Sequence, residues 1–115
     1  MNTSNPPTEL ASSLLRRSVC AVQVAAVLAD PWGVFAWGWN HSGPTGFGEH
    51  AECHCLRRAN KDRLQNATLY IAARRNRNGR AVTARPCPAC QKVIHSVGTI
   101  IFRDGDGAWK EFSKD

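Results

Sequence analysis

The longest apolar segment of the chain covers residues 19–29, in which Gln23 is the one polar residue. A run this uniform favours a strand that is buried on both faces, although its periodicity also allows a continuing helix. Its length suits the apolar part of a signal peptide, but the polar stretch before it is long, and cleavage after Ala29 would leave little to build a first strand before Asn40. We therefore interpret the segment as core structure, too short to span a membrane.

Weaker patterns predict an element on each side of this segment. We expect residues 1–7 to form a flexible N-terminal arm, and Thr8 to cap a helix that continues to about residue 18. Residues 30–33 have turn composition and lead to the aromatic, β-prone residues 34–40. The two strands that flank this turn are expected to form a hairpin.

The second half of the chain alternates helical and extended patterns. After a glycine-rich loop, the pattern predicts a helix over residues 49–63, a strand over 67–72, a helix over 87–96, and a terminal hairpin of strands 99–102 and 108–112. The turn of that hairpin is Asp104-Gly105-Asp106-Gly107, which lacks the further ligands of a calcium loop. The predicted order is therefore α-β-β-α-β-α-β-β.

Composition limits the class of protein without naming a function. The 115 residues suit one domain, which we expect to cover residues 8–115. The formal charge of +6 favours polyanionic partners or phosphorylated substrates, and it also suits simple solubility. Five cysteines, two of them in C-x-x-C spacing, indicate metal binding rather than a secreted disulfide framework, so we expect a cytoplasmic protein.

Two short motifs carry the candidate chemistry: His50-Ala51-Glu52 and Pro86-Cys87-Pro88-Ala89-Cys90, each at the start of a predicted helix. His50, Cys87 and Cys90 are candidate zinc ligands, because a catalytic zinc takes three protein ligands and leaves its fourth position to water. Glu52 lies close to them without being a fourth ligand, so it is the candidate that moves protons to and from that water.

The alternative interpretations of these motifs are a structural zinc, or a pair of buried thiols with an unrelated histidine. A structural zinc usually needs a fourth protein ligand, and the candidates are Cys53, His54 and Cys55. Cys53 and Cys55 are otherwise most simply small core residues. The order of residues does not match the H-E-x-x-H motif of zinc proteases, because Glu52 is one place too far along.

At these two motifs the chain resembles the cytidine deaminase-like superfamily, and the order of the elements agrees with that resemblance. The resemblance implies an α/β fold of three layers, with a central five-stranded mixed sheet, helices on both faces and an antiparallel last strand. It also implies Zn²⁺ as cofactor, deamination of a cytosine-type base, and possible assembly into a homo-oligomer.

The resemblance further assigns substrate contacts. Gly38-Trp39-Asn40 resembles the family's G-x-N strand end, so Asn40 is implied to bind substrate, although an asparagine here also suits a turn. The main chain near Ala51 and Cys87 is implied to help hold the ring. His41 is expected either to line the pocket or to lie in the loop.

Three departures from the family pattern concern the substrate. Residue 50 is His, where the free-nucleoside cytidine deaminases have Cys, which favours the nucleotide, nucleobase and nucleic-acid branches. Ala84 and Arg85 precede Pro86, so the Ser-Trp-Ser sequence of the vertebrate polynucleotide deaminases is missing. Only 25 residues follow Cys90 in this sequence, so we expect the C-terminal helices of many relatives to be absent or reduced.

Basic and aromatic residues are the remaining candidates for substrate choice. Five arginines between the third strand and the second motif are expected either to border the site and bind phosphate or to form a solvated loop: Arg74, Arg75, Arg77, Arg80 and Arg85. Trp32, Trp37 and Trp39 could stack on bases or fill the core.

The leading hypothesis is zinc-dependent hydrolytic deamination of a cytosine-type base in a pyrimidine nucleotide or nucleoside. A deaminase acting on single-stranded or duplex DNA or on RNA is the second hypothesis, because of the charge, the arginines and the tryptophans. A zinc-stabilised nucleic-acid binding module without activity is the third. No membrane partner is expected.

Overall fold

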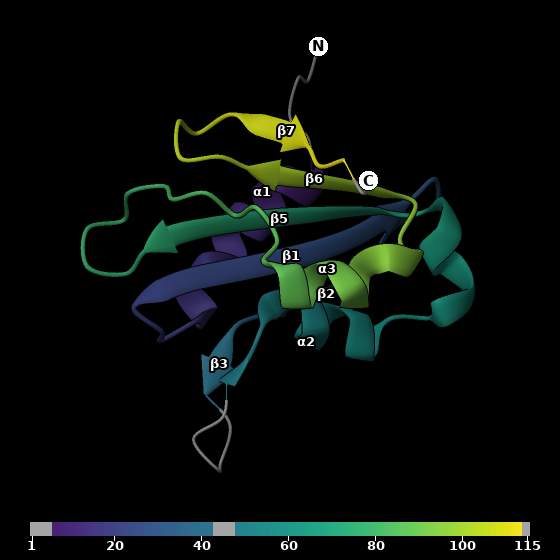
Figure 1. Cartoon of the computed structure of the whole chain (residues 1–115), viewed down its shortest axis with the longest axis horizontal. Coiled ribbons are helices and arrows are strands. Elements are labelled where there is room, and N and C mark those ends of the chain that lie inside the picture. The colour runs from purple at the N-terminus through teal and green to yellow at the C-terminus, as the bar shows by residue number, and fades with distance from the viewer. Residues whose placement is uncertain (1–5, 43–47, 114–115) are drawn as a thin grey trace.

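A five-stranded mixed sheet forms the centre of the molecule, whose computed structural model describes residues 6–42 and 48–113 (Figure 1). The strand order is β2-β1-β5-β6-β7, with β5 and β6 parallel and the other neighbours antiparallel. The strands are β1 (Val22–Asp30), β2 (Gly33–Trp39), β5 (Thr68–Arg75), β6 (Thr99–Arg103) and β7 (Trp109–Glu111). The sheet confirms the predicted five strands and the antiparallel last strand.

Helices cover both faces of this sheet and complete the three layers. In Figure 1, α1 lies behind the sheet, and α2 and α3 lie in front of it. The α-helices are α1 (Pro6–Leu14), α2 (Ala51–Arg58) and α3 (Pro88–Val93). Each is followed by a short 3-10 helix: η1 (Leu15–Arg17), η2 (Lys61–Asn66) and η3 (Ile94–Ser96). No helix of the described residues is long and apolar enough to cross a membrane.

Strand β1 explains why its sequence shows no alternation. Ala26 and Leu28 belong to the core under α2 and α3, whereas Ala25 and Val27 belong to the core under α1. All four are completely buried. Residues 19–29 therefore include a strand covered on both faces, as predicted, and the alternative of a continuing helix is wrong.

Several predicted helix bounds are wrong for local reasons. The expected helix over residues 49–63 ends at Arg58, because Ala59 is extended and the Asn60 side chain accepts a hydrogen bond from the Asp62 main-chain nitrogen (3.0 Å), which starts η2. The first helix begins at Pro6 rather than after Thr8, since proline is tolerated in a first helical turn. The first five residues of the predicted arm lie outside the described residues.

A small antiparallel pair, β3 (His41–Ser42) and β4 (Gly48–Glu49), stands where the sequence predicts only a loop. Residues 43–47 of that loop lie outside the described residues.

The terminal hairpin is confirmed: the Asp104 nitrogen donates to Ala108 oxygen (2.8 Å), and the Lys110 ammonium pairs with Asp104 and Asp106.

Candidate active site

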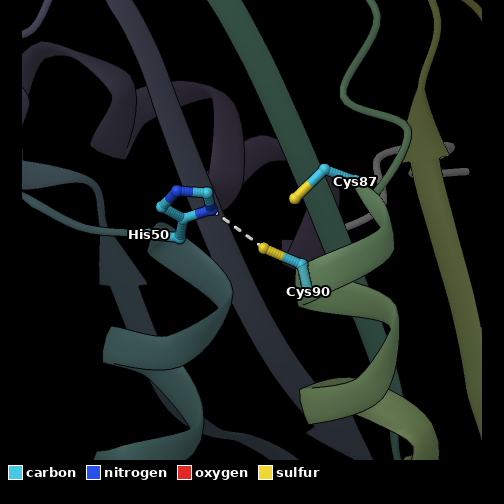
Figure 2. Close-up of side chains that lie close together, drawn as sticks. All are labelled: His50, Cys87 and Cys90. Atoms are coloured by element: carbon cyan, nitrogen blue, oxygen red, sulfur yellow. Dashed lines mark hydrogen bonds between the residues drawn. The ribbon is translucent and has the colours of Figure 1, made fainter.

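Two helix N-termini meet in front of the sheet and bring the two motifs together (Figure 2). His50 immediately precedes α2 and Cys87 immediately precedes α3, both with extended backbone. Pro88 occupies the first helical position of α3, where its fixed φ suits a helix start. Cys90 follows within the first turn, so its thiol faces the same point as that of Cys87.

The ligand atoms of His50, Cys87 and Cys90 all lie within 4.8 Å of one another, and Nδ1 of His50 is 2.9 Å from Sγ of Cys90. Burial raises the pKa of the Cys90 thiol, and the negative charge of Glu52 raises it further. A buried thiol of this kind becomes an anion when a cation takes the place of its proton. One imidazole and two thiols match the three protein ligands of a catalytic zinc, so the donor set fits this metal.

Glu52 points into the same site from the first turn of α2. Its side chain is buried, with 5% of the residue exposed, and burial raises the pKa of its carboxyl group. A hydrogen bond with Cys90 and the proximity of His50 act in the opposite direction. A carboxyl group with a raised pKa can take up and release a proton nearer to neutral pH, as general acid–base chemistry requires.

A cavity of about 190 Å³ opens beside these residues. Its walls come from β1, the end of β2, β5, the segment before α3, and the two helix N-termini. The lining residues are Val22, Val24, Asn40, His50, Ala51, Glu52, Ala73, Thr83, Ala84, Arg85, Cys87 and Cys90. The residues predicted for metal binding, proton transfer and substrate contact therefore share one pocket, with the exception of His41.

Asn40 serves both the sheet and the pocket. Its Oδ1 accepts a hydrogen bond from the Val24 nitrogen (2.8 Å), and its Nδ2 donates to the Val22 oxygen (2.8 Å). These bonds continue the pairing along β1 beyond the end of β2. An amide side chain has two donor hydrogens and two acceptor lone pairs. Asn40 thus keeps one donor and one acceptor position for a molecule in the cavity.

Comparison with known proteins identifies the family. A model of the cytidine and deoxycytidylate deaminase zinc-binding region matches residues 4–102. The chain belongs to this family. No curated protein sequence matches the chain.

Solved structures agree with this assignment at the level of the fold. A cytidine deaminase from Burkholderia pseudomallei superposes with a TM-score of 0.71 and 18% identity, covering 98% of this chain and 94% of that one. A dCMP deaminase from cyanophage S-TIM5 superposes with a TM-score of 0.63 and 21% identity, covering 86% of this chain and 80% of that one. A cytidine deaminase from Mycobacterium leprae superposes with a TM-score of 0.61 and 15% identity, covering 96% of this chain and 94% of that one.

The candidate fourth ligands of a structural zinc do not join the group of candidate metal ligands. Within residues 6–42 and 48–113, that group contains none of Cys53, His54 and Cys55. Nδ1 of His54 lies 3.1 Å from the Trp39 main-chain nitrogen, and burial lowers the pKa of the ring. Cys55 is buried, which raises the pKa of its thiol to about 12. This arrangement favours a three-ligand site.

His41 lies outside the residues that line the cavity. Its Nε2 is 3.2 Å from Oε1 of Glu49, its Nδ1 is 3.1 Å from the Trp39 oxygen, and its ring packs edge-on against that of His54. Both ring nitrogens therefore have partners within the protein. These contacts argue against a direct contact between His41 and substrate.

The five arginines do not form one loop at the site. Arg74 and Arg75 belong to β5, and Nε of Arg74 donates to Oε1 of the buried Gln23 (2.7 Å). Arg85 lines the cavity and stacks over the ring of Phe112, at 4.9 Å. Arg75 and Arg77 line a separate hollow.

The tryptophans differ in exposure. Trp32 is 86% exposed in the turn after β1, whereas Trp37 is 39% exposed and has Arg58 over its ring. Trp39 is half-buried against His54 and Arg17. None of the three lines the cavity.

Sequence reasoning missed the apolar wall of the cavity. Val22, Val24 and Ala73 have no chemical signature and reach the site through the register of β1 against β5, which pairs Val24 with Ala73. Thr83 approaches through the segment that leads to α3. The position of these residues at the cavity depends on the long-range register of β1 against β5, which no local motif encodes.

Proposed function

We propose that the chain is a zinc-dependent hydrolase that removes the amino group of a cytosine-type base in a nucleotide or nucleoside. Ammonia and a uracil-type base are the products. The observation that carries the proposal is the buried Glu52 carboxyl group beside His50, Cys87 and Cys90, at one wall of a cavity of about 190 Å³.

His50, Cys87 and Cys90 would hold the metal. Zinc supplies Lewis acidity that makes water a nucleophile near neutral pH. The overall step forms a bond between C4 and the water oxygen and breaks the bond between C4 and nitrogen, with no change in oxidation state. The three thiol and imidazole ligands leave Glu52 free for proton transfer.

Glu52 accepts a proton from the attacking water and delivers it to the ring nitrogen; it then carries the second proton, from the new C4 hydroxyl group, to the amino group, which departs as ammonia. Its burial supports this role, because a raised pKa allows the carboxyl group to hold the proton between the two transfers. Asn40 would bind the sugar side of the substrate with its free amide positions. The main chain at Ala51 and Cys87 and the side chain of Arg85 would border the base.

A substrate panel tests the proposal. Zinc-loaded protein is incubated with cytidine, deoxycytidine and their 5′-monophosphates, and with cytosine-containing DNA and RNA, and ammonia and base products are measured. We expect turnover of at least one monomeric substrate. Activity on polymers alone would favour a polynucleotide deaminase. Salt-sensitive nucleic-acid binding with no turnover would favour a binding module, and either result would overturn the proposal.

A further inference from the structure

A second hollow adjoins the cavity and has a different chemistry. We call it the arginine hollow. It measures about 320 Å³ and is lined by Ala21, Val22, Arg75, Arg77 and Asn78. Val22 lines both the arginine hollow and the cavity beside His50. A molecule that fills the cavity can therefore reach the arginine hollow across one residue.

The arginine hollow carries positive charge without local compensation. Arg75 and Arg77 are both exposed, and no ion pair found within residues 6–42 and 48–113 involves either side chain. The sequence from Arg74 to Arg85 contains no Asp or Glu. Two guanidinium groups in one depression offer the forked donors that bind phosphate oxygens in pairs.

The main chain holds this hollow in shape before any ligand arrives. The Asn76 nitrogen donates to Ala21 oxygen (2.9 Å) and ties the turn to the segment before β1. The Arg75 nitrogen donates to Arg80 oxygen (2.9 Å), and the Gly79 nitrogen donates to Arg75 oxygen (2.8 Å). Gly79 has φ of +71°, a left-handed conformation that glycine adopts at low cost. A fixed frame lowers the entropy lost when a ligand binds.

We propose that the arginine hollow binds the phosphate of a pyrimidine mononucleotide whose base occupies the cavity beside His50. This inference rests on the proposed function and selects a nucleotide over a free nucleoside. Each part of the nucleotide then has its own binding residues: the base lies in the cavity, Asn40 binds the sugar, and Arg75 and Arg77 bind the phosphate.

The arrangement favours a mononucleotide over a single-stranded polymer. Proteins that bind single strands combine a basic groove with aromatic side chains on which bases stack. The most exposed tryptophan, Trp32, follows Asp30 at the far end of β1, roughly 26 Å along the strand from Val22. None of Trp32, Trp37 and Trp39 lines the arginine hollow.

Equilibrium binding to zinc-loaded Glu52→Gln protein tests the inference without turnover. We expect cytidine 5′-monophosphate to bind about 10- to 100-fold more tightly than cytidine. The double variant Arg75→Ala/Arg77→Ala in the same background should lose this difference and keep its affinity for cytidine. Arg80→Ala is the matched control, because Arg80 is an exposed arginine of the same turn that lines neither hollow, and its main-chain bond survives the substitution.

Inorganic phosphate provides a second readout on the protein with its arginines intact. It should weaken binding of the monophosphate by competition and leave cytidine binding unchanged. Equal affinities for cytidine and its monophosphate, or a preference that survives the double substitution, would overturn the inference. A short single-stranded oligodeoxycytidylate that binds more tightly than the monophosphate would also overturn it. The proposed function is tested by a different measurement, ammonia release by the parent protein, so its failure can be distinguished from failure of this inference.

Discussion

At the scale of single residues, the site depends on one carboxyl group and three ligands held by two helix starts. Glu52 is buried and its pKa is raised by that burial, whereas His50 and Cys87 are exposed. The two motifs thus place a buried carboxyl group beside the candidate metal-binding atoms. Separate substitutions can distinguish proton transfer from metal binding.

Glu52→Gln should abolish proton transfer while it keeps the shape and burial of the side chain. We expect kcat to fall by about 10²- to 10⁴-fold, because the amide can neither accept nor return the proton. Steady-state ammonia release measures the loss, and elemental analysis checks that zinc content is unchanged. Full activity in this variant would contradict the proposed role of Glu52.

Cys90→Ala should remove zinc, whereas Cys53→Ala should retain it. Cys90 belongs to the group of ligand atoms within 4.8 Å of one another, and Cys53 lies in α2 outside that group. The measurement is zinc per protein chain after purification in the presence of zinc, with circular dichroism as the folding control. Equal zinc content in both variants would rule out the assigned ligand set.

At the scale of elements, the close approach of α2 to β2 sets the position of the site. A Cβ atom at Gly38 would lie 2.6 Å from the Cys55 main-chain nitrogen, so only glycine allows this spacing. Gly38 is buried in β2, and Cys55 lies in the helix that follows His50. A shift of α2 away from the sheet would displace His50 and Glu52 together.

Gly38→Ala should therefore destabilise the fold, by about 1–3 kcal/mol in the free energy of unfolding, because overpacking forces backbone to move. Gly105→Ala is the control, since a Cβ there meets its nearest atom at 3.8 Å and its φ is not positive. Urea unfolding followed by circular dichroism compares the two variants with the parent. If the Gly38 and Gly105 variants proved equally stable, the helix would not be constrained by this contact.

An ion pair joins η2 to the end of β1. Nε and Nη2 of Arg63 donate to the two carboxylate oxygens of Asp30 at 2.6 and 2.7 Å, and the guanidinium group stacks over Phe35 at 4.2 Å. The Asp30 side chain is only 3% exposed. The hydrogen bonds from Arg63 hold the pKa of Asp30 below its ordinary value of 3.8.

Since the folded pKa of Asp30 lies below the unfolded one, the pair stabilises the fold above about pH 4 and loses this effect as pH falls through the folded value. Asp30→Asn should lower Tm at pH 7, and the difference from the parent should shrink towards pH 3. The amide oxygen can still accept from the Trp32 nitrogen, so the turn keeps its hydrogen bond. Thermal melts between pH 3 and pH 7 measure Tm of both proteins, and Asp62→Asn, at an exposed position, is the control. A Tm difference between Asp30→Asn and the parent that does not change with pH would contradict this account.

The sequence predicts the individual strands and the candidate zinc ligands because both depend on local patterns, whereas the arrangement of the strands in one mixed sheet is implied by the family resemblance. Residues 19–29 and the two motifs carry their signals within a few positions. The break between α2 and η2 depends on the Asn60 cap inside an otherwise helical pattern, and propensity alone does not identify it. The arginine hollow depends on the pairing of Val22 with Arg75, which no local pattern contains.

At the scale of the whole molecule, the topology gathers the chemistry at one end of the sheet. Strands β5 and β6 are parallel, so the chain must cross between them, and α3 lies in that crossover. The N-terminus of α3 follows the carboxyl end of β5, the place where α/β sheets commonly bind ligands. The antiparallel pairs β1–β2 and β1–β5 then bring Asn40, Val22 and Ala73 to the same end.

Net charge acts at the same scale. The formal charge of +6 attracts anionic substrates over distances longer than a single contact. This attraction is screened by salt, so it increases the rate of association more than it selects the substrate. The selective contacts remain those of the cavity and the arginine hollow.

The most direct test of the central claim is the fate of isotopic oxygen during turnover. Zinc-loaded protein is incubated separately with cytidine, deoxycytidine and their 5′-monophosphates in water enriched in ¹⁸O, and the products are analysed by mass spectrometry together with ammonia. The account predicts a uracil-type product that carries one ¹⁸O at C4, one ammonia for each base converted, and conversion about 10²- to 10⁴-fold slower with Glu52→Gln. No uracil-type product from any of these four substrates, or a product without ¹⁸O at C4, would contradict hydrolytic deamination at this site.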